Sequence, residues 1–231
     1  MLTAPQNQPD RLGFLREKIA LAARAAGRDP AAIRLIGVAK SQPLQQLRAA
    51  VDGGLTDIAE NYLQEARDHI AALQGRRLTW HFVGALQSNK TRQVAELFDW
   101  VHTVDRPRIA ARLAEQRPQG RPPLVVCIQV RLGGEPAKSG VEPGELAALA
   151  ARIAGLPRLV LRGLMTLPPE AADPERQRHW FRELRRLQLE LNGAGHCLDV
   201  LSMGMSGDFE SAIAEGATHL RIGSALFGPR G

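Results

Sequence analysis

The sequence lacks most of the features that mark membrane, secreted or metal-binding proteins. No apolar run reaches the roughly 18 residues that a transmembrane helix needs, so we expect no membrane partner. The segment 1–14 has no basic stretch followed by an apolar one, so we expect no secretory signal and a cytoplasmic protein. The two cysteines, Cys127 and Cys197, cannot build a disulfide scaffold and are expected in the core. The histidines lack zinc-ligand spacing, which argues against a metal site.

Lysine is scarce although the chain is basic. The formal net charge is +6 and the sequence pI is about 10.1, yet only four of the 30 basic residues are lysines. They are Lys18, Lys40, Lys90 and Lys138. Because arginine serves as the general surface cation, a lysine here is a candidate for chemistry that arginine cannot perform, such as Schiff-base formation.

The basic charge also raises the question of nucleic-acid binding. The segment 176–186 carries five arginines with Trp180 and Phe181 between them. An amphipathic helix with a solvated basic face accounts for this pattern better than a nucleic-acid surface does. We therefore do not expect nucleic acid as a partner.

A strand followed by a helix recurs along the chain after an opening helix over about 10–27. The expected strands cover 33–40, 56–61, 78–84, 99–105, 124–132, 158–167, 197–204 and 217–223. The expected helices end near 52, 74, 97, 117, 154, 192 and 216, and a helical turn covers 224–228. Eight such units predict an α/β fold, a (β/α)₈ TIM barrel with an extra N-terminal helix, in a single domain over 1–231. An open doubly wound sheet is the alternative, although no GxGxxG follows the first strand.

The last two strand ends carry the strongest chemical signal. Functional residues of such a barrel lie at the C-terminal ends of the strands. Glycine-bearing turns occur at 202–208 (SMGMSGD) and 221–228 (RIGSALFG). Glycine lets backbone N–H groups approach a ligand, and serine hydroxyls and helix N-termini favour an anion, so the two turns predict a phosphate site. Ordinary capping, with Ser206 as an N-cap and Gly223 as a turn residue, is the alternative.

Two basic residues at strand ends have open interpretations. Lys40 ends the first strand, where its amine either extends into solvent or attacks an aldehyde held beside the phosphate site. Arg221 lies in a run that should be buried, where it needs either an ion-pair partner or a ligand. Asn61, His81 and Lys138 are further candidates because they lie in or after other strands.

Segments along nearly the whole chain together resemble the pyridoxal phosphate homeostasis proteins, single-domain relatives of the alanine racemase barrel. They are IRLIGVAKSQP (33–43), AENYLQEA (59–66), WHFVGALQSNK (80–90), VHTVDR (101–106), GGEPAKSGV (133–141), RGLMTLPP (162–169), LSMGMSGDFESAI (201–213) and RIGSALFG (221–228). The resemblance implies a barrel of PLP fold type III that holds pyridoxal 5′-phosphate (PLP) as an aldimine on Lys40. Asn61 and His81 would line the pocket, and Arg221 would face the pyridine nitrogen. The phosphate would be held by Ser202, Met203, Ser206, Gly223 and Ser224.

Some positions depart from the family pattern. Ala59, Ala85 and Arg131 stand where glycine, proline and asparagine are more common, and Ser224 stands where threonine is common. Gln42 stands where many members have a second lysine. These departures do not affect PLP binding, but they leave Lys138 as the obvious candidate for any secondary lysine role.

The function implied by the resemblance is non-catalytic PLP binding in intracellular vitamin B6 homeostasis, with delivery to PLP-dependent apo-enzymes as a further role. An arginine opposite the pyridine nitrogen keeps that nitrogen unprotonated, so the ring is a poor electron sink. Racemases of this fold also use a tyrosine from an additional domain, whereas the single tyrosine here, Tyr62, lies on the barrel itself. The alternatives are a PLP-dependent amino-acid racemase and a basic nucleic-acid-binding module. We expect a monomer.

Overall fold

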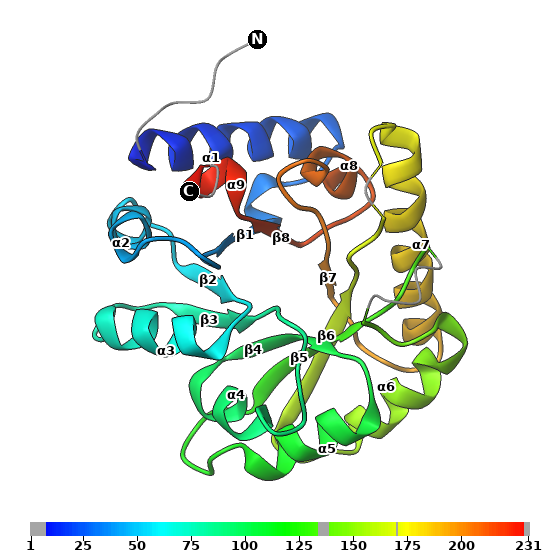
Figure 1. Cartoon of the computed structure of the whole chain (residues 1–231). Coiled ribbons are helices and arrows are strands. Elements are labelled where there is room, and N and C mark those ends of the chain that lie inside the picture. The colour runs from blue at the N-terminus through cyan, green and yellow to red at the C-terminus, as the bar shows by residue number, and fades with distance from the viewer. Residues whose placement is uncertain (1–7, 134–138, 170, 229–231) are drawn as a thin grey trace.

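The computed structural model describes residues 8–133, 139–169 and 171–228. Lys138, the predicted secondary lysine, lies outside the described residues. Within them, eight parallel strands close into a barrel in sequence order, β1 beside β8 (Figure 1). The predicted TIM barrel is therefore confirmed, and the alternative of an open doubly wound sheet is wrong.

The strands and helices alternate as the apolar pattern predicts. The strands are β1 Arg34–Val38, β2 Asp57–Glu60, β3 Thr79–Phe82, β4 Trp100–Val104, β5 Leu124–Gln129, β6 Leu159–Met165, β7 Val200–Ser202 and β8 His219–Ile222. The helices after them are α2 Leu44–Asp52, α3 Leu63–Ala72, α4 Thr91–Leu97, α5 Pro107–Gln116, α6 Leu146–Ala154, α7 Pro174–Gly193, α8 Phe209–Ala214 and α9 Ser224–Phe227. Short 3₁₀ turns cover Pro30–Ala32 (η1) and Pro143–Glu145 (η2).

The extra N-terminal helix, α1 Gln8–Ala25, packs across α8, α9 and α2 (Figure 1). Its buried residues Leu12, Leu15, Ile19 and Ala23 recur every three or four positions and so form one apolar face. This face lies against the end of the chain that closes the barrel. None of the described helices combines the length and apolar character needed to cross a bilayer.

Several strands are shorter than the apolar runs predict. The run 124–132 contains only β5, because the chain leaves the sheet after Gln129 and Val130 pairs with Val141 in an isolated bridge. Val130 and Leu132 are buried all the same, so burial continues beyond the strand. Cys127 is buried in the core as expected, but Cys197 is exposed, so its assignment to the core is wrong. Cys197 lies in the loop before β7, which the prediction had counted as strand.

Alternate side chains of each strand point to opposite faces, which separates two kinds of core. Residues such as Val101, Phe82 and Leu220 belong to the large apolar cluster that includes the helix residues. The alternate residues of the same strands point into the barrel. Two small apolar clusters lie there, Trp100 with Cys127, Met165 and Val200, and Ile36 with Ala59 and Val83. Polar side chains occupy the rest of this interior layer, including Asp57, His81, His102, Ser202 and Arg221.

The basic segment 176–186 forms part of α7, and several of its arginines are paired. Arg178 and Arg182 both bond the buried Glu215, at 2.8 and 3.0 Å. Arg186 pairs with Glu183 and Glu190 on its own helix. These ion pairs neutralise part of the basic face, as expected for a solvated helix surface.

Candidate functional site

The C-terminal ends of the strands surround a cavity of about 770 Å³. Six of the predicted site residues line it: Lys40, Asn61, Ser206, Arg221, Gly223 and Ser224. Val38, Leu167, Gln177, Met205 and Asp208 also line it. The structure thus brings together residues that follow β1, β2, β7 and β8, although up to 184 residues separate them in the sequence.

Lys40 lies in the turn after β1. Backbone hydrogen bonds from the residues on either side of it hold this turn in place. Ala39 N donates to Ala59 O of β2 at 2.9 Å, and Ser41 N donates to Glu65 Oε2 of α3 at 2.8 Å. Ser41 has φ +58°, a left-handed conformation that few residues other than glycine adopt. No described residue forms a hydrogen bond or ion pair with the Lys40 amine, which is therefore available to a molecule in the cavity.

The turns after β7 and β8 are joined directly. Ala225 N of α9 donates to Ser206 Oγ at 3.1 Å, so the hydroxyl of one turn contacts the backbone of the other. Gly204 has φ +95°, and a Cβ there would lie 2.7 Å from Ala212 Cβ, so the first turn requires glycine. Asp208, not Ser206, precedes α8 as its N-cap, so the alternative in which Ser206 caps this helix is wrong. Gly223 does precede α9.

Asn61 contributes a polar atom that has no partner. Its side-chain Oδ1 is buried, and no described residue donates a hydrogen bond to it. The backbone around it is tightly packed, since a Cβ on Gly84 would lie 2.1 Å from the Asn61 carbonyl oxygen. A buried acceptor without a donor is costly, and a ligand in the cavity would relieve this.

Arg221 is 4% exposed and contacts neutral oxygen atoms. Its Nη1 donates to Ser202 Oγ at 2.8 Å and its Nη2 donates to the Thr166 carbonyl at 2.9 Å. No described residue forms an ion pair with Arg221, so the ion-pair interpretation is wrong. The other interpretation, contact with a ligand in the cavity, remains. Burial lowers the pKa of Arg221 to about 10, and the side chain is still a cation at neutral pH.

The other predicted residues, Ser202, Met203 and His81, do not line the cavity. Met203 is fully buried in the large apolar cluster. Ser202 is also fully buried, and its hydroxyl contacts Arg221 and His102. His81 lies inside the barrel, 2.9 Å from His102 Nε2 and 3.0 Å from Asp57 Oδ1. The prediction placed His81 in the pocket wall, whereas the structure places it one layer deeper.

The sequence analysis missed Asp57 and His102, which complete this deeper layer. Both lie inside the expected strands 56–61 and 99–105, which were assigned without asking which face each polar residue occupies. The available signal was the two-residue alternation, which puts Asp57, His81 and His102 on the interior faces of β2, β3 and β4.

Comparison with known proteins places the chain in a family. The alanine racemase N-terminal domain family matches residues 11–231. A pyridoxal phosphate homeostasis protein of Pseudomonas aeruginosa is 54% identical over 221 residues, which cover 96% of this chain and 95% of that protein. The chain belongs to the pyridoxal phosphate homeostasis protein family. The family member of Escherichia coli is 47% identical over 222 residues, 95% of each chain.

Solved structures agree with this family assignment. PipY of Synechococcus elongatus with PLP bound is 36% identical, has a TM-score of 0.86, and matches 96% of this chain and all of that one. Alanine racemase of Clostridium difficile is only 15% identical, with a TM-score of 0.74 over 57% of its chain. The racemase is therefore similar in fold alone, whereas the homeostasis family is similar in sequence and fold.

Proposed function

We propose that this protein binds PLP in the cavity of about 770 Å³ and serves vitamin B6 homeostasis without catalysing a reaction. One observation carries the proposal: an unpartnered lysine amine, a buried arginine and two serine-bearing turns line the same cavity. The relatives at 54% and 47% identity, named pyridoxal phosphate homeostasis proteins, support it. The cavity volume falls in the range of roughly 300–1,000 Å³ that small-ligand sites occupy.

The residues at the cavity fit the separate chemical groups of PLP. PLP, when bound, would supply an aldehyde, a group that reacts with a primary amine. Lys40 would provide that amine. Ser206, Ser224 and the backbone at Gly223 would hold the phosphate, because hydroxyls and closely spaced N–H groups bind anions.

The unpartnered Asn61 oxygen supports the fit most directly. An acceptor buried in the cavity wall would be costly unless a ligand donated to it or brought an ordered water. Val38, at the end of β1, and Leu167, after β6, also line the cavity and supply apolar surface suited to a planar aromatic ring. Arg221 would face the ring nitrogen, while Ser202 and His81 would support it from the layer below, and Met203 would pack behind the turn in the large apolar cluster.

Two features favour storage over catalysis. Arg221 is a cation at neutral pH, and an N–H donor facing the ring nitrogen leaves that nitrogen unprotonated and the ring a weak electron sink. The chain has a single tyrosine, and Tyr62 is 55% exposed, so no buried tyrosine is available as a second base. The racemase alternative predicts exchange of the α-proton of D- or L-alanine in heavy water faster than free PLP achieves.

Titration with PLP tests the proposal. The unaltered protein should turn yellow and bind PLP, and Lys40→Ala should lose the colour. Lys90→Ala is the matched control, because Lys90 precedes α4 and does not line the cavity. A colourless unaltered protein at saturating PLP, or a Lys40→Ala variant as yellow as the control, would contradict the proposal.

Delivery to PLP-dependent apo-enzymes extends the proposal. A reversible link to one amine would keep the free aldehyde concentration low while leaving PLP transferable. Mixing the loaded protein with an apo-enzyme and an excess of a free aldehyde scavenger tests direct transfer, since only direct transfer activates the enzyme under that condition. We further propose that the chain works as one domain and as a monomer, which sedimentation at several concentrations would test.

A further inference from the structure

Five buried polar side chains form one hydrogen-bonded chain across the interior of the barrel. Arg221 Nη1 lies 2.8 Å from Ser202 Oγ, and Ser202 Oγ lies 2.7 Å from His102 Nδ1. His102 Nε2 lies 2.9 Å from His81 Nδ1, and His81 Nε2 lies 3.0 Å from Asp57 Oδ1. The members come from β8, β7, β4, β3 and β2, and each is at most 7% exposed.

Arg221 and Asp57, the two ends of this hydrogen-bonded series of side chains, fix the direction of every hydrogen bond in it. Arginine can only donate, and an ionised carboxylate can only accept. Asp57 therefore receives a hydrogen from His81 Nε2, which leaves Nδ1 of a neutral His81 as an acceptor. His102 must then donate from Nε2 and accept at Nδ1. Ser202 donates its hydroxyl hydrogen to His102 and accepts from Arg221.

The charge states agree with this assignment. Burial alone would raise the pKa of Asp57, but hydrogen bonds from His81 and Thr56 lower it overall, so the carboxylate is ionised. Burial lowers the pKa of His81 despite Asp57, and it lowers the pKa of His102 well below the ordinary value. Both imidazoles are thus neutral at neutral pH, each with one donor and one acceptor nitrogen. None of the five side chains has a buried polar atom without a partner among the described residues.

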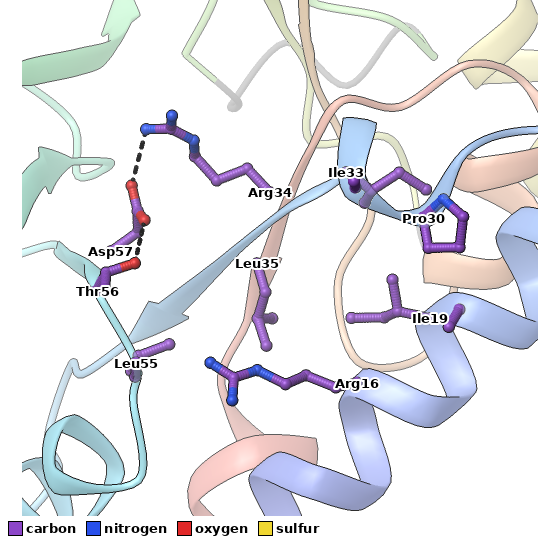
Figure 2. Close-up of a pocket in the computed structure, with 11 residues that line it drawn as sticks. Arg16, Ile19, Pro30, Ile33, Arg34, Leu35, Leu55, Thr56 and Asp57 are labelled. Atoms are coloured by element: carbon purple, nitrogen blue, oxygen red, sulfur yellow. Dashed lines mark hydrogen bonds and ion pairs between the residues drawn. The ribbon is translucent and has the colours of Figure 1, made fainter.

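This series of five hydrogen-bonded side chains runs from one end of the barrel to the other. Arg221 lines the cavity at the C-terminal ends of the strands. Asp57 begins β2 and lines a different cavity, of about 480 Å³, at the N-terminal ends. Figure 2 shows Asp57 there with its two other partners, Arg34 Nη1 at 3.0 Å and Thr56 Oγ1 at 2.8 Å. Asp57 Oδ1 therefore accepts from both His81 and Arg34 of β1, while Oδ2 accepts from Thr56.

We propose that Asp57, His81, His102 and Ser202 are positioning residues, whose one-way chain of hydrogen bonds holds the Arg221 guanidinium in the orientation that it presents to the cavity. The proposal rests on the proposed function, since Arg221 would face the ring nitrogen of PLP. The guanidinium needs such a support because Asp208 lines the same cavity and its negative charge acts on Arg221. A Ser202 hydroxyl that is itself donating is a stronger acceptor, which favours the bond to Arg221.

Ser202→Ala breaks the chain with little change in volume. It leaves Arg221 Nη1 and His102 Nδ1 without partners, so we expect PLP affinity to fall on the order of tenfold and the absorption band of bound PLP to shift. Ser202→Thr keeps the hydroxyl and should restore both. Thr91→Val is the matched control: it removes a fully buried hydroxyl, which bonds Ser88 O and Gln116, far from this chain.

Asp57→Asn tests the hydrogen-bonded series from its Asp57 end, which does not line the proposed PLP cavity. The amide keeps the shape of the carboxylate but no longer compels His81 to donate, so the tautomers of His81 and His102 lose their fixed assignment. We expect ¹⁵N NMR of the ligand-free protein to give the Nε2–H tautomer for both histidines in the unaltered chain and a changed pattern in Asp57→Asn. The band of bound PLP should shift as well, whereas Asp52→Asn, at an exposed pair with Arg76, should alter neither.

The outcomes separate this proposal from the proposed function. If the unaltered protein binds PLP, but Ser202→Ala and Asp57→Asn leave its affinity and its absorption band at the values of the Thr91→Val and Asp52→Asn controls, the positioning role is wrong and PLP binding stands. A mixture of tautomers in the unaltered protein would likewise overturn the one-way chain. If the unaltered protein binds no PLP, the proposed function fails, and the positioning role towards that ligand fails with it.

Discussion

Acid should destabilise this protein through the buried histidine His219. The side chain belongs to β8, is 7% exposed, and lies tilted against Trp100 with ring centroids 5.2 Å apart. Its Nδ1 lies 3.0 Å from Thr218 Oγ1, while its buried Nε2 has no partner among the described residues. Burial lowers the pKa of His219 to about 3, and the nearby positive charge of Arg34 adds to this. The folded protein therefore holds the imidazole neutral.

The size of the effect follows from proton linkage. In the unfolded chain a histidine titrates near pH 6.5, so between that pH and about pH 3 the unfolded state binds one proton more than the folded state. Stability from this group is full above about pH 6.5 and falls by about 1.4 kcal/mol for each pH unit below it. At pH 5 the loss is about 2 kcal/mol relative to pH 8.

Urea unfolding at pH 8, 6 and 5 measures this loss. His81 and His102, whose pKa values burial also lowers, add to this loss, whereas His69 and Glu60, whose pKa values are raised in the folded protein, oppose it. The difference between the unaltered protein and His219→Gln isolates the contribution of His219. His179→Gln, at an exposed position on α7, is the control. If His219→Gln loses as much stability on acidification as the unaltered protein does, the reasoning is refuted.

Two further substitutions test the packing that supports the site. Arg117 is 2% exposed and donates to the carbonyls of Ala95, Phe98 and Pro122, so Arg117→Met should lower the free energy of unfolding by about 3 kcal/mol or more. An unchanged urea midpoint would contradict that role. Gly84→Ala places a Cβ 2.1 Å from the Asn61 carbonyl oxygen, so we expect a loss of about 1–3 kcal/mol and weaker PLP binding. Gly144→Ala meets nothing within 4 Å and should change neither quantity.

Much of the fold could be predicted because apolar runs and helix signals alternate regularly along the chain. The C-terminal end of each strand was then enough to select Lys40, Asn61 and the two serine-bearing turns, since a barrel brings all strand ends to one rim. The limits of the strands were harder. The run 124–132 is buried throughout, and hydrophobicity alone does not reveal where the chain leaves the sheet.

The polar layer inside the barrel could not be predicted in the same way. A barrel strand is buried on both faces, so a polar residue such as Asp57 or His102 looks like an interruption of an apolar run. Its partners depend on the stagger of the strands, which decides that His102 of β4 meets Ser202 of β7 across the interior. Sequence distance gives no indication of that contact, because 100 residues separate the two side chains.

The identity of the lysine that captures the aldehyde tests the central claim most directly. Borohydride reduction of the PLP-loaded protein fixes the C=N bond, and peptide mapping by mass spectrometry then identifies the labelled residue. The account predicts a single phosphopyridoxyl group on Lys40 at equimolar PLP. Label spread evenly over the four lysines of the chain, or confined to Lys18, Lys90 or Lys138, would contradict it.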